Sequence, residues 1–212
     1  VVMSINMFIT GGRAGQVMFF SMLAIIIFQY FSKQKLKAFF LMILVTSSIF
    51  FGAYQSSSIF YERVNDVYTN IQVYETNKFT SVGLRVSMIL NSWKIIEENF
   101  FLGVGTGDFP DEYKKINEIN TPELPDSTNP HNMFILIWVQ LGLIGLLSFL
   151  MIFYYQLKIS FQSNDNFYKH VGITLPILYL IIMFSDSYLL GHYTSLLFFF
   201  FSSFLYKDFR AN

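Results

Sequence analysis

Two arginines and one histidine lie at the polar edges of a strongly apolar chain, where they could act on a charged substrate. Arg13 follows two glycines in the segment TGGRAG, Arg85 lies in SVGLRVSMILNSW, and His131 lies in NPHN. A guanidinium group binds phosphate oxygens through two parallel hydrogen bonds. A histidine can take up a proton near neutral pH. Together these residue types could stabilise an anionic leaving group and deprotonate an attacking hydroxyl.

Each of the three residues also has a structural interpretation. Arg13 could anchor the end of a membrane helix, because a long basic side chain reaches the water at the interface. Arg85 could be a solvated charge on a helix whose other face is apolar, and a lone histidine is often structural. Pro130 fixes the entry to the apolar stretch that follows, and Asn132 could cap or orient that helix. The residue types alone leave these alternatives open.

The segment LGVGTGDF, residues 102–109, contains three alternate glycines. It is not a dinucleotide-binding fingerprint, because Asp108 stands where that motif needs its last glycine and no predicted strand precedes it. We therefore predict a turn with positive φ angles, which glycine adopts without strain.

Asp186 and His192 flank another polar turn near the C-terminal end. They could pair with each other or with Arg13, and the sequence does not distinguish these arrangements. A metal site built from His131, His192 and Asp186 has no support in their spacing. The chain has no cysteine, which excludes disulfides, thiolate catalysis and a Cys-ligated metal. We predict no cofactor and no metal ion.

The composition places these residues in a membrane protein. Of the 212 residues, 53% are apolar and 13% are charged, and 26 are phenylalanine. A soluble domain has about 25% charged residues. The net charge is zero, whereas proteins that bind nucleic acid usually carry a basic stripe. We therefore expect membrane lipids, and not nucleic acid, as partners of the chain.

Apolar stretches of the length that a bilayer requires, about 20 residues, predict several helical spans. The predicted spans are Ala14–Phe31, Leu36–Tyr54, Met133–Leu157, Val171–Phe184 and Thr194–Tyr206, and Val1–Ile9 is the end of another. Because the chain opens inside an apolar stretch, we expect it to be part of a longer protein. The expected fold class is an all-α integral membrane protein, a polytopic bundle of about five spans plus a partial one.

Lysine and arginine indicate on which side of the membrane each connection lies. Basic residues cluster at 33–37, 158–169 and 207–210, and these three connections can all be cytoplasmic at once. The turns at 11–13 and 185–193 and the long segment 55–132 then lie on the extracytoplasmic side.

The segment 55–132 is predicted to be one large extracytoplasmic loop with short helices. Helical periodicity indicates a helix over Ser81–Phe101 and a second over Asp108–Asn120. The chain thus divides into N-terminal spans at 1–54, this loop at 55–132, and C-terminal spans at 133–212, within one membrane domain.

Several short motifs follow one another around the predicted loop. They are Arg13 in its glycine-rich turn, Ser81–Gly83–Arg85 with the following Trp93, Gly103–Gly105–Gly107–Phe109, His131–Asn132–Phe134, and Leu141–Gly142–Gly145–Leu146. In their order and spacing they resemble the O-antigen ligase and O-antigen polymerase family of bacterial membrane glycosyltransferases. The resemblance covers Gly11 to about Leu150. It implies that the chain is the C-terminal half of a larger helical bundle.

The resemblance implies an enzyme of the bacterial inner membrane whose active face is extracytoplasmic. Such an enzyme takes a glycan from a polyprenyl diphosphate and transfers it to a hydroxyl of lipid A core or of another growing glycan. The family's two arginines and one histidine map onto Arg13, Arg85 and His131. This mapping implies that the arginines stabilise the leaving diphosphate without a metal ion and that the histidine is the base of a single, inverting displacement. The implied substrate-binding residues are Arg13, Arg85, Asn132, Gly105 and Trp93.

Two non-enzymatic classes stay open on the residues alone. A transporter or channel usually has ionisable or discontinuous elements in the middle of its spans, whereas the predicted spans are nearly free of charge. An assembly protein would present the outer loop without any reaction. The sequence also leaves open the choice between ligase and polymerase, and the identity of the sugar.

Overall fold

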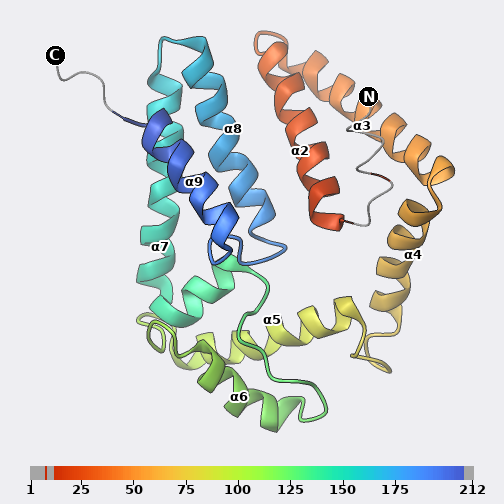
Figure 1. The fold of residues 1–212 in the computed structure, drawn as a ribbon, viewed down its shortest axis with the longest axis vertical. Helices are drawn as coiled ribbons and strands as arrows, with labels where there is room; N and C mark the ends of the chain where they lie inside the picture. Colours follow the sequence, from red (N-terminus) through yellow and green to blue (C-terminus); the bar gives the residue numbers. More distant parts are fainter. Residues whose placement is uncertain (1–7, 9–11, 208–212) are drawn as a thin grey trace. The chain divides into compact units, whose positions relative to one another are not determined.

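The computed structural model describes residue 8 and residues 12–207, except for the side chain of Arg13. All regular structure in this part of the chain is helical (Figure 1), which confirms the expected all-α class. The helices are α2 (Arg13–Tyr30), α3 (Lys35–Ser56), α4 (Ser58–Gln72), α5 (Ser81–Glu98), α6 (Phe109–Asn120), α7 (Met133–Gln162), α8 (Asn166–Ile182) and α9 (His192–Leu205). The partial span predicted over Val1–Ile9 lies outside the described residues, apart from Phe8.

The chain divides into two compact units, Val1–Gln72 and Val73–Asn212. In the first unit α2 and α3 lie side by side and α4 follows α3. The Phe50 ring of α3 links them, because its centroid lies 6.4 Å from that of Phe20 in α2 and 5.3 Å from that of Phe60 in α4. Helix α4 has no counterpart among the predicted elements, because its sequence SIFYERVNDVYTNIQ has too many polar residues for a span.

Among the described residues, two helices are long and apolar enough to cross a membrane by length and composition, Lys35–Ser56 and Met133–Gln162. The apolar helices Ala14–Tyr30, Asn166–Ile182 and His192–Leu205 are shorter. Two of the predicted spans therefore meet this criterion, and the bundle of five spans stays a prediction.

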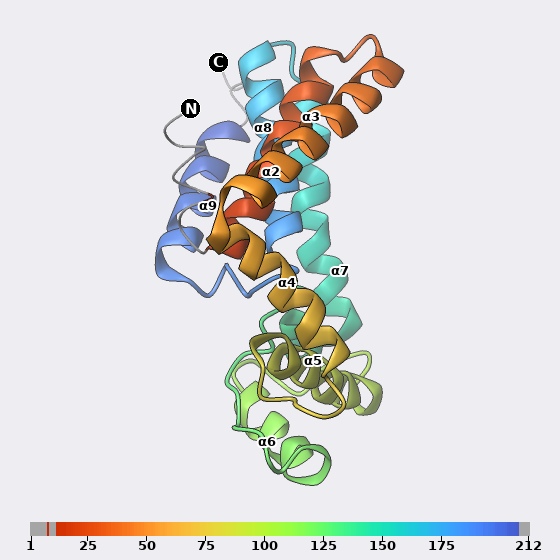
Figure 2. The ribbon, with the colours of Figure 1, turned by 90° about the vertical axis from the view of Figure 1, so that its right-hand side faces the viewer.

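The second unit is a bundle of α7, α8 and α9, with α5 and α6 lying across one end of α7 (Figures 1 and 2). A buried apolar cluster joins the two parts. It includes Met88 of α5, Met133 of α7, Tyr179 of α8 and Phe198 of α9. Burying one large apolar side chain contributes about 1.5–3 kcal/mol. The cluster therefore holds α5 firmly against the beginning of α7.

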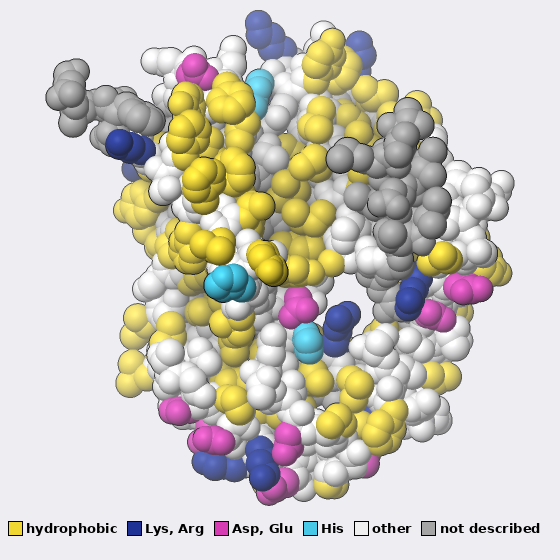
Figure 3. Space-filling view, viewed as in Figure 1, with side chains coloured by type: hydrophobic (Ala, Val, Ile, Leu, Met, Phe, Trp, Pro, Cys, Tyr) yellow, Lys and Arg dark blue, Asp and Glu magenta, His cyan; other side chains and the backbone are white. Residues whose placement is uncertain are grey.

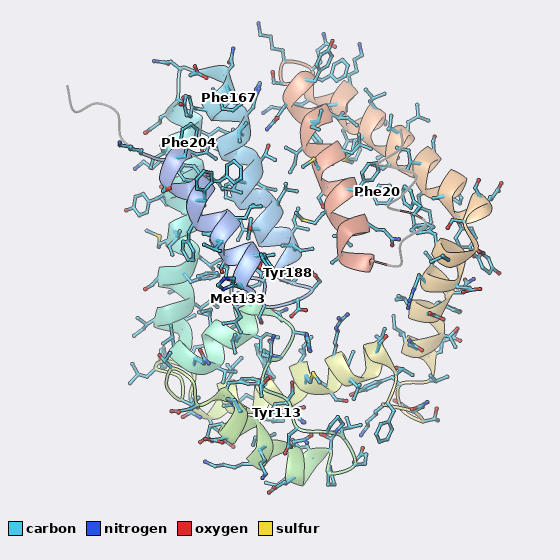
Figure 4. All side chains as sticks on the ribbon, viewed as in Figure 1. Phe20, Tyr113, Met133, Phe167, Tyr188 and Phe204 are labelled. Atoms are coloured by element: carbon cyan, nitrogen blue, oxygen red, sulfur yellow. The ribbon has the colours of Figure 1, made fainter. Side chains whose placement is uncertain are left out.

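The helices predicted inside the polar segment are present as α5 and α6, although α5 ends at Glu98 instead of reaching Phe101. A buried hydrogen bond connects the two helices where Asn91 Nδ2 donates to Thr121 Oγ1 at 2.7 Å. Tyr113 lies in the interior between α5 and α6 (Figure 4), and burial raises the pKa of its phenol. These contacts show that α5 and α6, which lie in the predicted polar loop, pack against each other.

The longest helix, α7, is broken at Gly142, whose φ of 65° and ψ of −169° are not helical. The break separates a short segment, 133–141, from a long one, 143–162. A side chain at this positive φ would be strained, and a Cβ at Gly142 would also overlap the backbone of Phe101. Hydropathy predicts one unbroken span here, because an apolar run does not reveal the φ angle of a glycine within it.

The connection between α5 and α6 enters this break and donates hydrogen bonds to it. The N–H groups of Val104 and Gly105 donate to Val139 O and Gln140 O at 2.9 and 3.0 Å. These are carbonyls that an unbroken helix would have paired internally. The glycines of this connection have the predicted positive φ angles, 70° at Gly103, 120° at Gly105 and 92° at Gly107.

The same connection accepts hydrogen bonds from the other side of the break. Phe100 O accepts from the N–H of Leu143 at 2.9 Å, and Phe101 O accepts from that of Ile144 at 3.4 Å. An unpaired backbone group costs several kcal/mol in an apolar environment. The break at Gly142 is therefore stable because donors and acceptors on both of its sides are paired.

Gly142→Ala is expected to destabilise the protein. Left-handed strain and overlap with the inserted connection together lower the free energy of unfolding by roughly 2–5 kcal/mol. Thermal unfolding in detergent, followed by the fluorescence of Trp93 and Trp138, measures this change. The matched control is Gly52→Ala in α3, where an added Cβ meets nothing within 4 Å. Equal midpoints for the two variants would contradict this account of the break.

Candidate functional site

His131 lies at the entry to α7 in a backbone conformation that its neighbours hold. Its φ of 51° is positive, which costs a residue with a Cβ about 1 kcal/mol or more. The His131 N–H donates to Asn129 Oδ1 at 2.9 Å, and Pro130 is fully buried. The imidazole therefore projects from a fixed point of the backbone.

Asn132 fixes the start of α7 against the end of α8. Its Oδ1 accepts from the N–H groups of Phe134 and Ile135 at 3.0 and 3.1 Å, and its Nδ2 donates to Phe184 O at 3.3 Å. The first N–H of α7 donates to Met183 O at 2.9 Å. The observed role of Asn132 is thus that of a buried helix cap, the alternative that the sequence left open beside substrate binding.

The structure pairs His131 with Asp186 in the connection between α8 and α9. His131 Nδ1 lies 3.1 Å from Asp186 Oδ1, and each side chain is 35% exposed. The same carboxylate oxygen accepts from the Ser187 N–H at 2.7 Å and from Asn129 Nδ2 at 3.5 Å. Ser187 Oγ closes the network by donating to Asn129 Oδ1 at 2.7 Å. Asp186 thus contacts His131, a pairing that the sequence did not suggest.

This network determines which nitrogen of His131 can react. A carboxylate accepts hydrogen bonds, so the pair is formed when Nδ1 carries a proton. In the neutral ring Nε2 then keeps its lone pair, and no described residue forms a hydrogen bond with it. A histidine held by a carboxylate through one nitrogen, with the other nitrogen unoccupied, is the arrangement of a general base.

An open depression of about 440 Å³ adjoins the pair. Its lining includes Asn129, Asp186, Tyr188, His192 and Tyr193. Figure 4 shows Tyr188 close to Met133, at the end of the bundle where α7 begins. The lining of the depression is mainly apolar, with Leu190 among its residues, and hydroxyl, amide and imidazole groups lie at intervals along it.

Arg85 lies in the first half of α5, on the same helical face as residues that are buried in the second half of the helix. Ser92 and Ile96 follow it after seven and eleven residues, nearly the same angular position on a helix of about 3.6 residues per turn. Both are fully buried, whereas Arg85 is exposed. Met88, one turn after Arg85, belongs to the buried cluster that also contains Met133. The face of α5 that packs near the start of α7 is therefore exposed at its Arg85 end, and the guanidinium projects from there.

No described residue forms a hydrogen bond or an ion pair with the Arg85 guanidinium. An exposed arginine without an internal partner keeps its donors available for an anion. No hydrogen bond joins Arg85 and His131 within the described part of the chain. A substrate lying between them could contact both.

Of the other predicted site residues, Arg13, Gly105 and Trp93, the last two form no hydrogen bond with the His131–Asp186 pair in the described part of the chain. Arg13 is the first residue of α2, in the unit Val1–Gln72, and its side chain lies outside the described residues. The Gly105 N–H is donated to Gln140 O, so it is not available to a phosphate. The Trp93 ring contacts Trp138 edge to face, with centroids 5.5 Å apart.

The described residues contain no group of three or more His, Asp or Glu side chains with the arrangement of a metal site. His131 and Asp186 contribute two such groups, and His192 does not complete a third position with them.

The sequence was compared with models of known protein families. The family model described as O-antigen ligase matches residues 1–150. The chain belongs to the O-antigen ligase family. Comparison with curated proteins gives no match. Membership confirms the resemblance and implies a membrane-associated enzyme of O-antigen assembly. The matched residues include Arg13, Arg85 and His131, and they end before Asp186.

Proposed function

We propose that this chain carries the reaction centre of a membrane glycosyltransferase that moves a glycan from a polyprenyl diphosphate to an acceptor hydroxyl. The acceptor is lipid A core in a ligase or a growing glycan in a polymerase. The observation that carries the proposal is the His131–Asp186 pair, in which Asp186 binds Nδ1 and no described residue forms a hydrogen bond with Nε2. Family membership supports the enzyme class, and the pair supports the kind of chemistry.

The proposed reaction is a single displacement at the anomeric carbon. His131 Nε2 takes the proton of the acceptor hydroxyl while the acceptor oxygen forms its bond to that carbon. The bond to the phosphate oxygen breaks, and its electron pair leaves with the polyprenyl diphosphate. Attack and departure on opposite sides invert the anomeric centre. A well-placed base contributes about 10²–10⁴-fold to the rate of such a step.

Asp186 acts in this proposal as a positioning residue. Its carboxylate holds the Nδ1 proton of His131 and stabilises the positive charge that the ring acquires during the transfer. Ser187 and Asn129 hold that carboxylate through their own hydrogen bonds. The carboxylate is thereby kept in place without contacting the substrate.

Arg85 and Arg13 are proposed to bind the diphosphate. Charge grows on the leaving oxygen as the glycosidic bond breaks, and guanidinium groups stabilise that charge through paired hydrogen bonds. The free donors and exposure of Arg85 support this role. For Arg13 the support is its place in the matched family region and in the motif GGRAG. Departure of the leaving group is then proposed to need no metal ion.

The proposed orientation places the site on the extracytoplasmic side of the bacterial inner membrane. Lys158 and Lys169 lie at the opposite end of α7 and α8 from His131. Figure 3 shows apolar side chains covering much of the α7–α9 region, whereas charged side chains gather over α6 at one end of the unit. The bias of basic residues toward the cytoplasm supports this orientation.

His131→Gln tests the proposed base. Glutamine cannot take the proton, so transfer in vitro from a polyprenyl-diphosphate-linked glycan is expected to fall by roughly 10²–10⁴-fold. His170→Gln is the matched control, because His170 is exposed near the other end of α8. Normal surface polysaccharide from a stably expressed His131→Gln protein would refute the catalytic role. In cells, loss of all polymer from lipid A indicates a ligase, and a single repeat unit indicates a polymerase.

Arg85→Lys tests the diphosphate contact. Lysine keeps the charge but not the planar fork, so transfer is expected to fall by about tenfold or more. Lys94→Ala is the matched control, since Lys94 is an exposed cation on the same helix that pairs with Glu97 at 2.9 Å. If the two variants transfer glycan at the wild-type rate, Arg85 does not bind the leaving group.

A further inference from the structure

Helix α5 has a second apolar face that the described chain covers only in part. Val82, Val86, Ile89, Leu90 and Trp93 recur at the spacing of one helical face. Leu90 is 53% exposed and Trp93 is 43% exposed. The fully buried face of α5 packs against α6 and α7, and within this stripe only Trp93 has a ring contact with α7, at Trp138.

The stripe continues into a group of aromatic rings where α5 meets α7. The Trp138 ring lies 5.5 Å from that of Trp93 and 5.3 Å from that of Phe100. Phe100 contacts Phe101 at 5.1 Å, and Phe101 and Leu102 are largely exposed. We call Trp93, Phe100, Phe101, Leu102 and Trp138 the aromatic shelf. Trp138 Nε1 donates to Phe100 O at 3.2 Å, which fixes the shelf to α7.

The aromatic shelf is continuous with the outer surface of α7. The carbonyls of Phe100 and Phe101 accept from the first two N–H groups after the break, so the shelf adjoins the start of the long segment of α7. The exposed apolar side chains of that segment include Ile144, Leu147 and Met151. Exposed apolar side chains therefore lie on both sides of the junction between α5 and α7.

The far end of α7 has the features of an opposite membrane boundary. Tyr154 and Tyr155 are exposed there, and Lys158 Nζ lies 5.9 Å from the Tyr155 ring centroid. From Leu143 to Lys158 a helix extends roughly 23 Å at about 1.5 Å per residue, about three quarters of the roughly 30 Å hydrocarbon core, and the shelf beside Leu143 extends the apolar surface beyond the start of this segment. Tryptophan and tyrosine favour the two membrane interfaces. The aromatic shelf thus lies at one boundary and the tyrosines at the other.

We infer that α5 lies along the membrane surface and that the aromatic shelf is buried in the interfacial layer of the lipid bilayer. Helix α5 crosses the end of α7 instead of running along it (Figures 1 and 2), the direction that this placement requires. Glu97 follows Trp93 by four residues on nearly the same face and pairs with Lys94 at 2.9 Å, so the apolar stripe ends at Trp93 and charged side chains follow it. Arg85, next to the apolar stripe, lies at the depth of lipid phosphates. The inference rests on the membrane placement in the proposed function but not on the transfer reaction.

Intrinsic fluorescence tests the inference directly, because the chain has two tryptophans and both belong to the shelf. The full chain is reconstituted in phosphatidylcholine vesicles as the variants Trp138→Phe and Trp93→Phe, each with one tryptophan left. Phosphatidylcholine brominated near the head-group end of its acyl chains is expected to lower the emission about twofold or more. Bromine near the chain ends should lower it less, and aqueous iodide should leave it nearly unchanged.

Two outcomes overturn the inference. Quenching by iodide without an effect of brominated lipid would place the shelf in water. Protection from both quenchers would mean that protein covers it. A third variant, Met151→Trp in the Trp93→Phe/Trp138→Phe background, separates this failure from a failure of the membrane placement. Lipid brominated near the ends of its acyl chains quenches this tryptophan if α7 crosses the bilayer, wherever the aromatic shelf lies.

Discussion

The break in α7 at Gly142 is the constraint on which the rest of the second unit depends. A helix that stops hydrogen-bonding to itself inside an apolar region must find other partners for its backbone groups. Here the connection after α5 supplies them, with Phe100 and Phe101 accepting on one side and Val104 and Gly105 donating on the other. This exchange fixes α5 and α6 across the end of α7.

The fixed junction explains why a reactive pair can form at this end of the bundle. The short segment of α7 before the break carries His131 at its entry, and its first N–H groups are held by Asn132 and by the end of α8. The same end of α8 leads directly to Asp186. Two residues far apart in sequence thus meet because one helix starts where the other ends. Their pairing positions Nε2 of His131 for a proton transfer that the proposed function requires.

Local patterns in the sequence predicted the parts of this arrangement but not their contacts. Hydropathy predicted the apolar helices, periodicity predicted α5 and α6, and alternate glycines predicted the positive φ angles near Gly105. The break at Gly142 and the partner of Asp186 were not predictable in the same way. Each depends on backbone or side-chain contacts between segments distant in sequence, which no local pattern records. Asn132 and Gly105 illustrate the difference, since a family motif singled them out while the structure shows them stabilising α7.

The central claim is that Asp186 holds His131 with Nδ1 protonated and Nε2 available as a base. Nitrogen NMR of the full chain labelled at its three histidines measures this tautomer, with His131→Gln assigning the signal. We expect the neutral form of the His131 ring to carry its proton on Nδ1, and Asp186→Asn to lose this preference. A His131 ring protonated on Nε2, or one with the same tautomer mixture in wild type and Asp186→Asn, would contradict it.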